Sequence, residues 1–234
     1  MSDVVTSAGA AAGRLAEITG KIGAAARLAA RPVADIALIA IAKTHDARAI
    51  APLIAAGQRV FGENRVQEAA QKWPALREET SGLSLHLVGQ LQSNKALDAV
   101  NMFDAIHSVD RPSLITALAL AMDKAGRRPA CFVQVNIGDE PQKGGVGIAG
   151  LAAFIAQAQA ANLPIAGLMC VPPAMVEPAP YFALLAKFAR DHGVAGLSMG
   201  MSGDFETAVT LGATHVRVGS ALFGARPLIM SVTA

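Results

Sequence analysis

The sequence predicts an α/β protein built as a single closed (β/α)8 barrel, preceded by an N-terminal helix. Its 234 residues suit one large barrel domain, and a hydrophobic fraction of 53% can fill a large core. Short apolar segments alternate eight times with segments of helical periodicity. The apolar segments are nearly continuous, which is typical of parallel strands covered on both faces. An open doubly wound sheet is the alternative, but eight units favour closure.

The N-terminal segment is rich in Ala and Gly and carries few charges. We expect its first dozen residues to fray and the rest to form one amphipathic helix ending near Arg31 and Pro32. The chain is therefore divided into an N-terminal extension and helix, residues 1–30, and a single barrel domain, residues 31–234.

The eight predicted units follow in order. The strands are expected at 36–42, 58–62, 83–89, 104–109, 130–137, 165–170, 196–200 and 214–219. The helices that follow them are expected at 47–56, 64–79, 93–101, 112–125, 148–161, 181–192, 205–211 and from 220 onward. Gly57, Gly126, Gly193 and Gly212 each come directly after a helix, where glycine takes the left-handed conformation without strain.

Charge and composition exclude several classes of protein. With 20 basic and 18 acidic residues the net charge is +2, so nucleic-acid binding through bulk charge is not expected. The apolar segment 36–42 stops at Lys43 and 114–122 stops at Asp123, far short of the ~20 residues of a membrane span. A basic leader is missing, and Cys131 and Cys170 lie in apolar segments as expected of buried, reduced thiols. We therefore expect a cytoplasmic protein.

Lys43 is the candidate reactive residue, because an apolar strand delivers it to the end of the barrel where active sites form. A desolvated lysine is a free amine able to attack a carbonyl and form a Schiff base. The alternative is a solvated first residue of the loop.

The seventh and eighth strands end in small polar residues. Ser202 and Gly203 follow the seventh strand, and Gly219 and Ser220 follow Arg217 of the eighth. Loops after strands seven and eight form the usual phosphate site of such barrels, where backbone N–H groups and hydroxyls hold the anion. Helix capping is the alternative role of the two serines. A Schiff-base lysine beside a phosphate site fits pyridoxal 5′-phosphate, and it also fits the substrate of a sugar-phosphate aldolase.

Eleven segments of the chain resemble the pyridoxal-phosphate homeostasis protein family, whose members are similar to the barrel domain of alanine racemase standing alone. They span roughly residues 33–226 and read IAKT at 41–44, FGEN at 61–64, VQE at 66–68, HLVG at 86–89, LQSNK at 91–95, IHSVD at 106–110, VNI at 135–137, KG at 143–144, GLM at 167–169, LSMGMS at 197–202 and VRVGSALFG at 216–224. Ala42, Asp46 and Gly203 differ from the residues common at these positions in the family. These differences concern the fine tuning of the site and leave the assignment of the lysine unchanged.

The resemblance implies pyridoxal 5′-phosphate as cofactor, with Lys43 forming the Schiff base. Ser202, Gly219 and Ser220 would hold the phosphate, Arg217 would lie near the pyridine nitrogen, and Asn64 and Met201 would line the cofactor. An arginine beside that nitrogen keeps it unprotonated and weakens the ring as an electron sink.

Alanine racemases use a tyrosine of a second domain as their second acid/base, and the one tyrosine here is Tyr181, in the sixth unit. We therefore expect little or no turnover, and the resemblance implies a role in intracellular cofactor homeostasis. We also expect a monomer. Apo-enzymes that need the cofactor and free amino acids are its expected partners. A single-domain racemase or lyase that uses the same cofactor is the alternative.

Overall fold

A computed structural model describes residues 2–224 of the chain, and its strands form a closed parallel barrel. Neighbouring strands follow the sequence order, and β8 pairs with β1 from Ala37↔His215 to Ala40↔Val218. The predicted barrel is confirmed, and the open sheet is excluded. The strands are β1 (Ala37–Ile41), β2 (Val60–Glu63), β3 (Ser84–Leu87), β4 (Ala105–Val109), β5 (Ala130–Val135), β6 (Ile165–Cys170), β7 (Gly196–Ser198) and β8 (His215–Val218).

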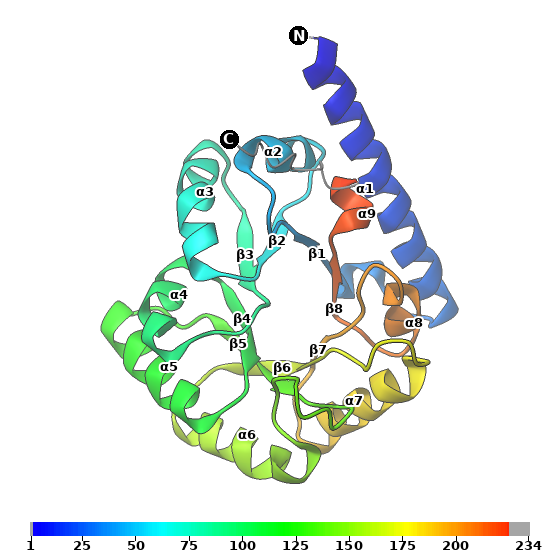
Figure 1. Cartoon of the computed structure of the whole chain (residues 1–234). Coiled ribbons are helices and arrows are strands. Elements are labelled where there is room, and N and C mark those ends of the chain that lie inside the picture. Colours follow the sequence, from blue (N-terminus) through cyan, green and yellow to red (C-terminus); the bar gives the residue numbers. More distant parts are fainter. Residues whose placement is uncertain (1, 225–234) are drawn as a thin grey trace, which may run out of the picture.

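The helices surround the strands as an outer ring (Figure 1). They are α1 (Ser2–Leu28), α2 (Ala47–Ala55), α3 (Val66–Glu79), α4 (Ala96–Met102), α5 (Pro112–Ala125), α6 (Leu151–Ala160), α7 (Ala179–Asp191), α8 (Phe205–Thr210) and α9 (Ser220–Phe223), and the 3-10 turns are Val33–Asp35, Ser93–Lys95 and Ile148–Gly150. Each predicted helix of the barrel is found within a few residues of its expected bounds, because its apolar positions repeat with the helical period.

The N-terminal helix differs from expectation at both ends. It begins at Ser2, where we expected a frayed segment, and Ala11 is already buried. It ends at Leu28, since Ala30 is left-handed (φ 51°) and Arg31 precedes Pro32, a position that disfavours helix. Arg31 also donates to Val209 O (2.8 Å), which ties the helix to α8. The N-terminal part of α1 extends past the helical ring (Figure 1), and the domain boundary at residue 30 stays a prediction.

The barrel has two hydrophobic cores of different size. The larger one lies between strands and helices and is apolar, and each large side chain buried there contributes about 1.5–3 kcal/mol. Cys131 and Cys170 are free and fully buried, as expected, and burial raises the pKa of each thiol to about 12. The smaller core consists of Ala105, Phe132 and Met169.

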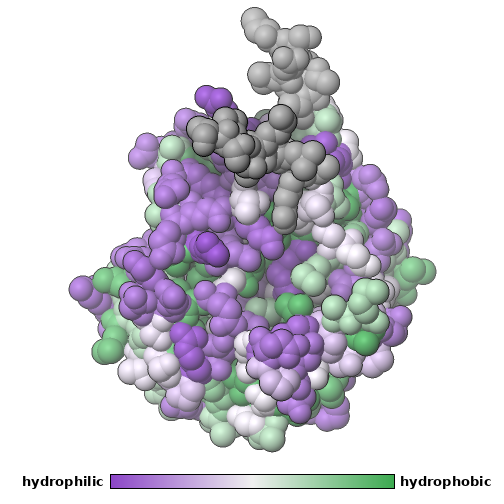
Figure 2. All heavy atoms as spheres, in the orientation of Figure 1, coloured by the Kyte–Doolittle hydropathy of each residue, from purple (hydrophilic) through white to green (hydrophobic). Residues whose placement is uncertain are grey.

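Figure 2 shows one face of the molecule, on which hydrophobic residues lie in small groups among hydrophilic ones. Within residues 2–224, none of the helices combines the length and apolar character that crossing a membrane requires.

Candidate cofactor site

A cavity of about 340 Å³ opens at the carboxyl ends of β1, β2, β7 and β8. That volume lies within the range of small-molecule sites. Its walls are formed by Ile41, Lys43, Thr44, His45, Asn64, Val88, Met169, Val171, Met201, Ser202, Arg217, Gly219, Ser220 and Gly224. Every predicted site residue except Gly203 therefore lines one cavity. A second cavity of about 390 Å³ lies outside the barrel between α3 and α4.

Lys43 lies on a tight turn directly after β1. Ala42 continues the strand pairing through a hydrogen bond to Gly62 O (2.9 Å), and Thr44 then turns the chain with a φ of 64°. Asp46 caps α2 by accepting the Ala49 N–H at 2.9 Å. The Lys43 side chain is exposed, so the desolvation that we expected around it is not found.

Lys72 of α3 hydrogen-bonds to the turn that carries Lys43 and holds it in place. The Lys72 ammonium donates to Ala42 O (2.8 Å) and His45 O (2.7 Å), and Glu68 accepts the Thr44 N–H. The same ammonium pairs with Glu63 Oε1 at 2.8 Å and Glu68 Oε1 at 3.2 Å. Two hydrogen bonds from one buried ammonium thus fix the carbonyls before and after Lys43, and two carboxylates hold that ammonium in place.

Glu63 is the buried counterion of Lys72. Its side chain is 0% exposed, and Oε1 also accepts the Trp73 Nε1–H at 2.8 Å. Burial raises the pKa of this carboxyl, and the hydrogen bonds from Lys72 and Trp73 lower the pKa by less than burial raises it. Glu63 ends β2, so the next residue, Asn64, emerges at the cavity. Asn64 packs so closely on Gly89 that a Cβ there would lie 2.3 Å from Asn64 O.

The loops after β7 and β8 meet at the cavity. Ser202 Oγ accepts the Gly219 N–H at 3.4 Å, and Asp204 accepts the Met201 N–H, which shapes the first loop. Within residues 2–224 the N–H groups of Ser202, Gly203 and Ser220 donate to no protein acceptor. The mouth therefore presents backbone donors and two exposed hydroxyls that an anion can use. Because α8 and α9 are short, the capacity to bind an anion comes from individual N–H groups and not from a helix dipole.

Arg217 forms the floor of the cavity and is 6% exposed. Its Nη1 donates to Ser198 O (2.8 Å) and Ser198 Oγ (2.7 Å), and Nη2 donates to Cys170 O at 2.8 Å. A guanidinium has five N–H donors, so donors remain for a ligand above it. Burial lowers its pKa from the usual value.

Two residues of this region were missed from the sequence. His45 lines the cavity and stacks on Phe223 with ring centroids 4.3 Å apart, and no motif singled it out. Lys72 was detectable, because it is a charged residue beside Ala69 and Trp73 on the buried face of a helix. Tyr181 is half-buried in the first turn of α7 and does not line the cavity.

The chain is similar to proteins of known family over nearly its full length. The profile described as "Alanine racemase, N-terminal domain" matches residues 15–227. The pyridoxal phosphate homeostasis protein of Escherichia coli (strain K12) is 39% identical over 228 residues, covering 91% of this chain and 95% of the relative. That of Pseudomonas aeruginosa PAO1 is 38% identical, covering 91% and 94%. The chain belongs to the pyridoxal phosphate homeostasis protein family.

Solved structures agree with this family assignment. PipY of Synechococcus elongatus PCC7942, solved with pyridoxal phosphate bound, is 40% identical and superimposes with a TM-score of 0.80 over 92% of this chain and 100% of PipY. Alanine racemase of Clostridium difficile 630 is 16% identical, with a TM-score of 0.64 over 82% of this chain and 53% of the racemase, and it shows the shared fold. The barrel of these solved structures is thus preserved in this chain.

Proposed function

We propose that this protein binds pyridoxal 5′-phosphate in the barrel mouth, as a Schiff base on Lys43, and serves cofactor homeostasis inside the cell with little or no turnover. The observation that carries the proposal is the convergence of Lys43, Arg217, Ser202 and Ser220 on one cavity. An amine, a buried cation and two hydroxyl-bearing loops match the aldehyde, the ring nitrogen and the phosphate of that cofactor. The PLP-bound structure of a 40% identical relative supports it.

Each part of the cavity has a role toward the cofactor. The cofactor supplies an electrophilic aldehyde and an aromatic ring that accepts electrons. Lys43 Nζ would supply the amine that bonds the aldehyde, and Met201, Asn64 and the apolar side chains that line the cavity would enclose the ring. Ser202, Gly203, Gly219 and Ser220 would hold the phosphate, Gly203 through its backbone N–H only. Arg217 would offer a remaining N–H donor to the ring nitrogen, and its permanent charge would keep that nitrogen unprotonated.

Low turnover follows from the scarcity of proton-transfer groups. A racemase needs an acid and a base on opposite faces of the substrate, each contributing about 10²–10⁴-fold. Among the residues lining this cavity, Lys43 and His45 are the side chains suited to moving a proton, and both lie on the same turn. A free amino acid would compete with Lys43 for the aldehyde, and this exchange would provide a route for releasing cofactor to apo-enzymes. We propose that the protein acts as a cytoplasmic monomer.

The first test locates the covalent bond. Reduction of the cofactor-loaded protein with borohydride should fix a pyridoxyl group on the peptide that contains Lys43, and Lys43→Ala should abolish the visible absorbance. Lys95→Ala is the matched control, because Lys95 lies outside the cavity. Labelling mainly at Lys95 or Lys143 would contradict the assignment.

The second test measures turnover. The loaded protein is incubated with single enantiomers of alanine or serine in deuterated water, and α-proton exchange is followed by NMR. We expect exchange far below enzymatic rates. Exchange at about 1–10³ s⁻¹ would establish a racemase or lyase instead, and loss of that exchange in His45→Gln would then identify its second group.

A further inference from the structure

The interior of the barrel holds a continuous row of polar side chains that ends at Arg217. Ser84 Oγ lies 3.1 Å from His86 Nε2, and His86 Nδ1 lies 3.0 Å from His107 Nε2. His107 Nδ1 lies 2.8 Å from Ser198 Oγ, which accepts from Arg217 Nη1 at 2.7 Å. The row crosses the barrel from the first residue of β3 to the cavity floor on β8.

Both histidines of the row are neutral. His86 and His107 are buried, and burial lowers the pKa of His86 to about 4 and that of His107 well below its usual value. The Arg217 cation and His215 also disfavour a charge on His107. A neutral imidazole has one N–H donor and one acceptor, so every hydrogen bond in the row must point the same way.

Ser198 determines the direction of the hydrogen bonds along the row. Its Oγ already accepts from Arg217, and within residues 2–224 its other partner is His107 Nδ1. If His107 donated to Ser198, the hydroxyl proton of this fully buried serine would have no acceptor, which costs free energy. Ser198 therefore donates to His107 Nδ1, His107 Nε2–H donates to His86 Nδ1, and His86 Nε2–H donates to Ser84.

Arg217 gains a specific environment from this row. No carboxylate in residues 2–224 lies within ion-pair distance of its buried guanidinium, so its direct partners are the neutral acceptors Ser198 and Cys170, while Asp204 favours its charge from farther away. A buried cation without a counterion is costly and is tolerated when its hydrogen bonds are complete. Ser198 can face Arg217 with its lone pairs only while His107 takes its proton.

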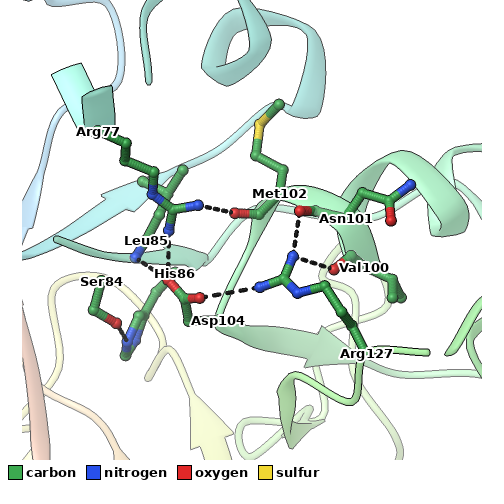
Figure 3. Close-up of polar contacts among 9 residues, drawn as sticks. All are labelled: Arg77, Ser84, Leu85, His86, Val100, Asn101, Met102, Asp104 and Arg127. Atoms are coloured by element: carbon green, nitrogen blue, oxygen red, sulfur yellow. Dashed lines mark hydrogen bonds and ion pairs between the residues drawn. The ribbon is translucent and has the colours of Figure 1, made fainter. Parts of the chain in front are cut away.

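We propose that Ser198 and His107 are positioning residues that hold Arg217 with its remaining N–H donors directed to the ligand. The proposal rests on the proposed function, since the ligand group it addresses is the ring nitrogen of pyridoxal phosphate. The row ends at Ser84, beside Leu85, whose N–H donates to Asp104. Asp104 pairs with Arg77 and Arg127 at the opposite end of the barrel (Figure 3), and these three residues form the Asp104 cluster.

The first experiment needs no cofactor. Nitrogen-15 NMR of the unliganded protein at neutral pH should show His86 and His107 as neutral tautomers protonated at Nε2, assigned with His86→Phe and His107→Phe. In Ser198→Ala, His107 loses its donor to Nδ1, and its Nδ1 resonance should move. A protonated Nδ1 on His107 in the wild type would overturn the proposal, whether or not the protein binds the cofactor.

The second experiment compares pyridoxal phosphate with its analogue that carries carbon in place of the ring nitrogen. The wild type should prefer the natural cofactor, and Ser198→Ala and His107→Phe should each reduce that preference by about three- to tenfold. Ser198→Thr retains the hydroxyl and should keep the wild-type preference for the natural cofactor. The His107 ring stacks on Phe132 with ring centroids 4.2 Å apart, and His107→Phe keeps an aromatic ring at this position.

His215→Phe is the matched control. His215 lies in the same interior and is also neutral, but it hydrogen-bonds Thr214 at 2.8 Å instead of joining the row. Its substitution should leave the preference for the ring nitrogen unchanged. An equal loss in His215→Phe and His107→Phe would assign the effect to packing and overturn the proposal. Wild-type protein that bound neither ligand would instead contradict the proposed function.

Discussion

The two ends of the barrel each carry a cluster of opposite charges, and the clusters differ in burial. At the mouth, Glu63 and Lys72 are 0% and 8% exposed and lie beneath the turn of Lys43. At the other end, Asp104 is 37% exposed and pairs with Arg77 and Arg127, which are 27% and 41% exposed. Arg77 and Arg127 also donate to the last carbonyls of α4, and Leu85 N–H donates to Asp104 (Figure 3).

The difference separates a cluster that supports the site from one that supports only the fold. Removing one partner of a buried pair leaves an uncompensated charge, whereas exposed pairs are screened by water. The Lys72 ammonium also fixes the two carbonyls that flank Lys43, so its loss should reach the cofactor. The Asp104 cluster lies at the opposite ends of the strands, and its loss should not.

Lys72→Met should produce the largest effect on stability. It leaves Glu63 buried without a counterion, and the free energy of unfolding should fall by about 3–5 kcal/mol. Denaturant titration measures this loss, and borohydride labelling of Lys43 in the remaining folded protein should also decrease. The double variant Glu63→Gln/Lys72→Met removes both charges and should regain most of the stability. A single variant as stable as the wild type would show that the buried pair is not holding the turn.

Acid should destabilise the protein through the histidines that lie between the two clusters. The folded-state pKa of His86 and of His215 is about 4, below the usual value of about 6.5. Between these values the unfolded chain binds protons that the folded chain does not. The free energy of unfolding should therefore fall as pH falls from about 6.5 to about 4, by up to about 1.4 kcal/mol per pH unit for each histidine.

Glu63 acts in the opposite direction, because its raised folded-state pKa favours the folded chain as pH falls, but it is one group against several histidines. Denaturant titrations across this pH range measure the slope. His215→Phe should have a shallower slope by about one proton, and an unchanged slope would show that His215 does not contribute.

Asp104→Ala should cost about 1 kcal/mol, because its ion pairs are partly exposed. Affinity for pyridoxal phosphate should stay at the wild-type level. Asp191→Ala, which breaks the exposed pair with Lys187, is the control and should cost less. A cofactor affinity lowered by Asp104→Ala would mean that the two ends of the barrel are coupled.

Ser202→Ala and Ser220→Ala should have the smallest effects. Each removes one exposed hydroxyl while leaving the backbone N–H groups, so binding should weaken by about 0.5–1.5 kcal/mol with stability unchanged. Equilibrium dialysis against pyridoxal phosphate measures the difference, and Ser113→Ala, on the exposed first turn of α5, is the control. Binding unchanged in both variants would place the phosphate elsewhere.

The sequence by itself determined the barrel and most of its mouth. Eight apolar segments are each followed by a helical segment. This order predicts a parallel sheet, closed into a barrel, whose strands are covered on both faces. Because all parallel strands point their carboxyl ends to one side, Lys43, Asn64, Arg217 and Ser220 were predicted to meet although they lie far apart in the chain. The cavity lined by these residues agrees with that prediction.

Tertiary structure alone decided how those residues are supported. The sequence gives no register between β3, β4, β7 and β8, so the alignment of His86, His107, Ser198 and Arg217 into one row appears only when the barrel closes. The same holds for Lys72, which lies 30 residues from Ala42 in the chain. Hydrogen bonds depend on ångström distances between side chains of different strands and helices, and local periodicity carries no information about those distances.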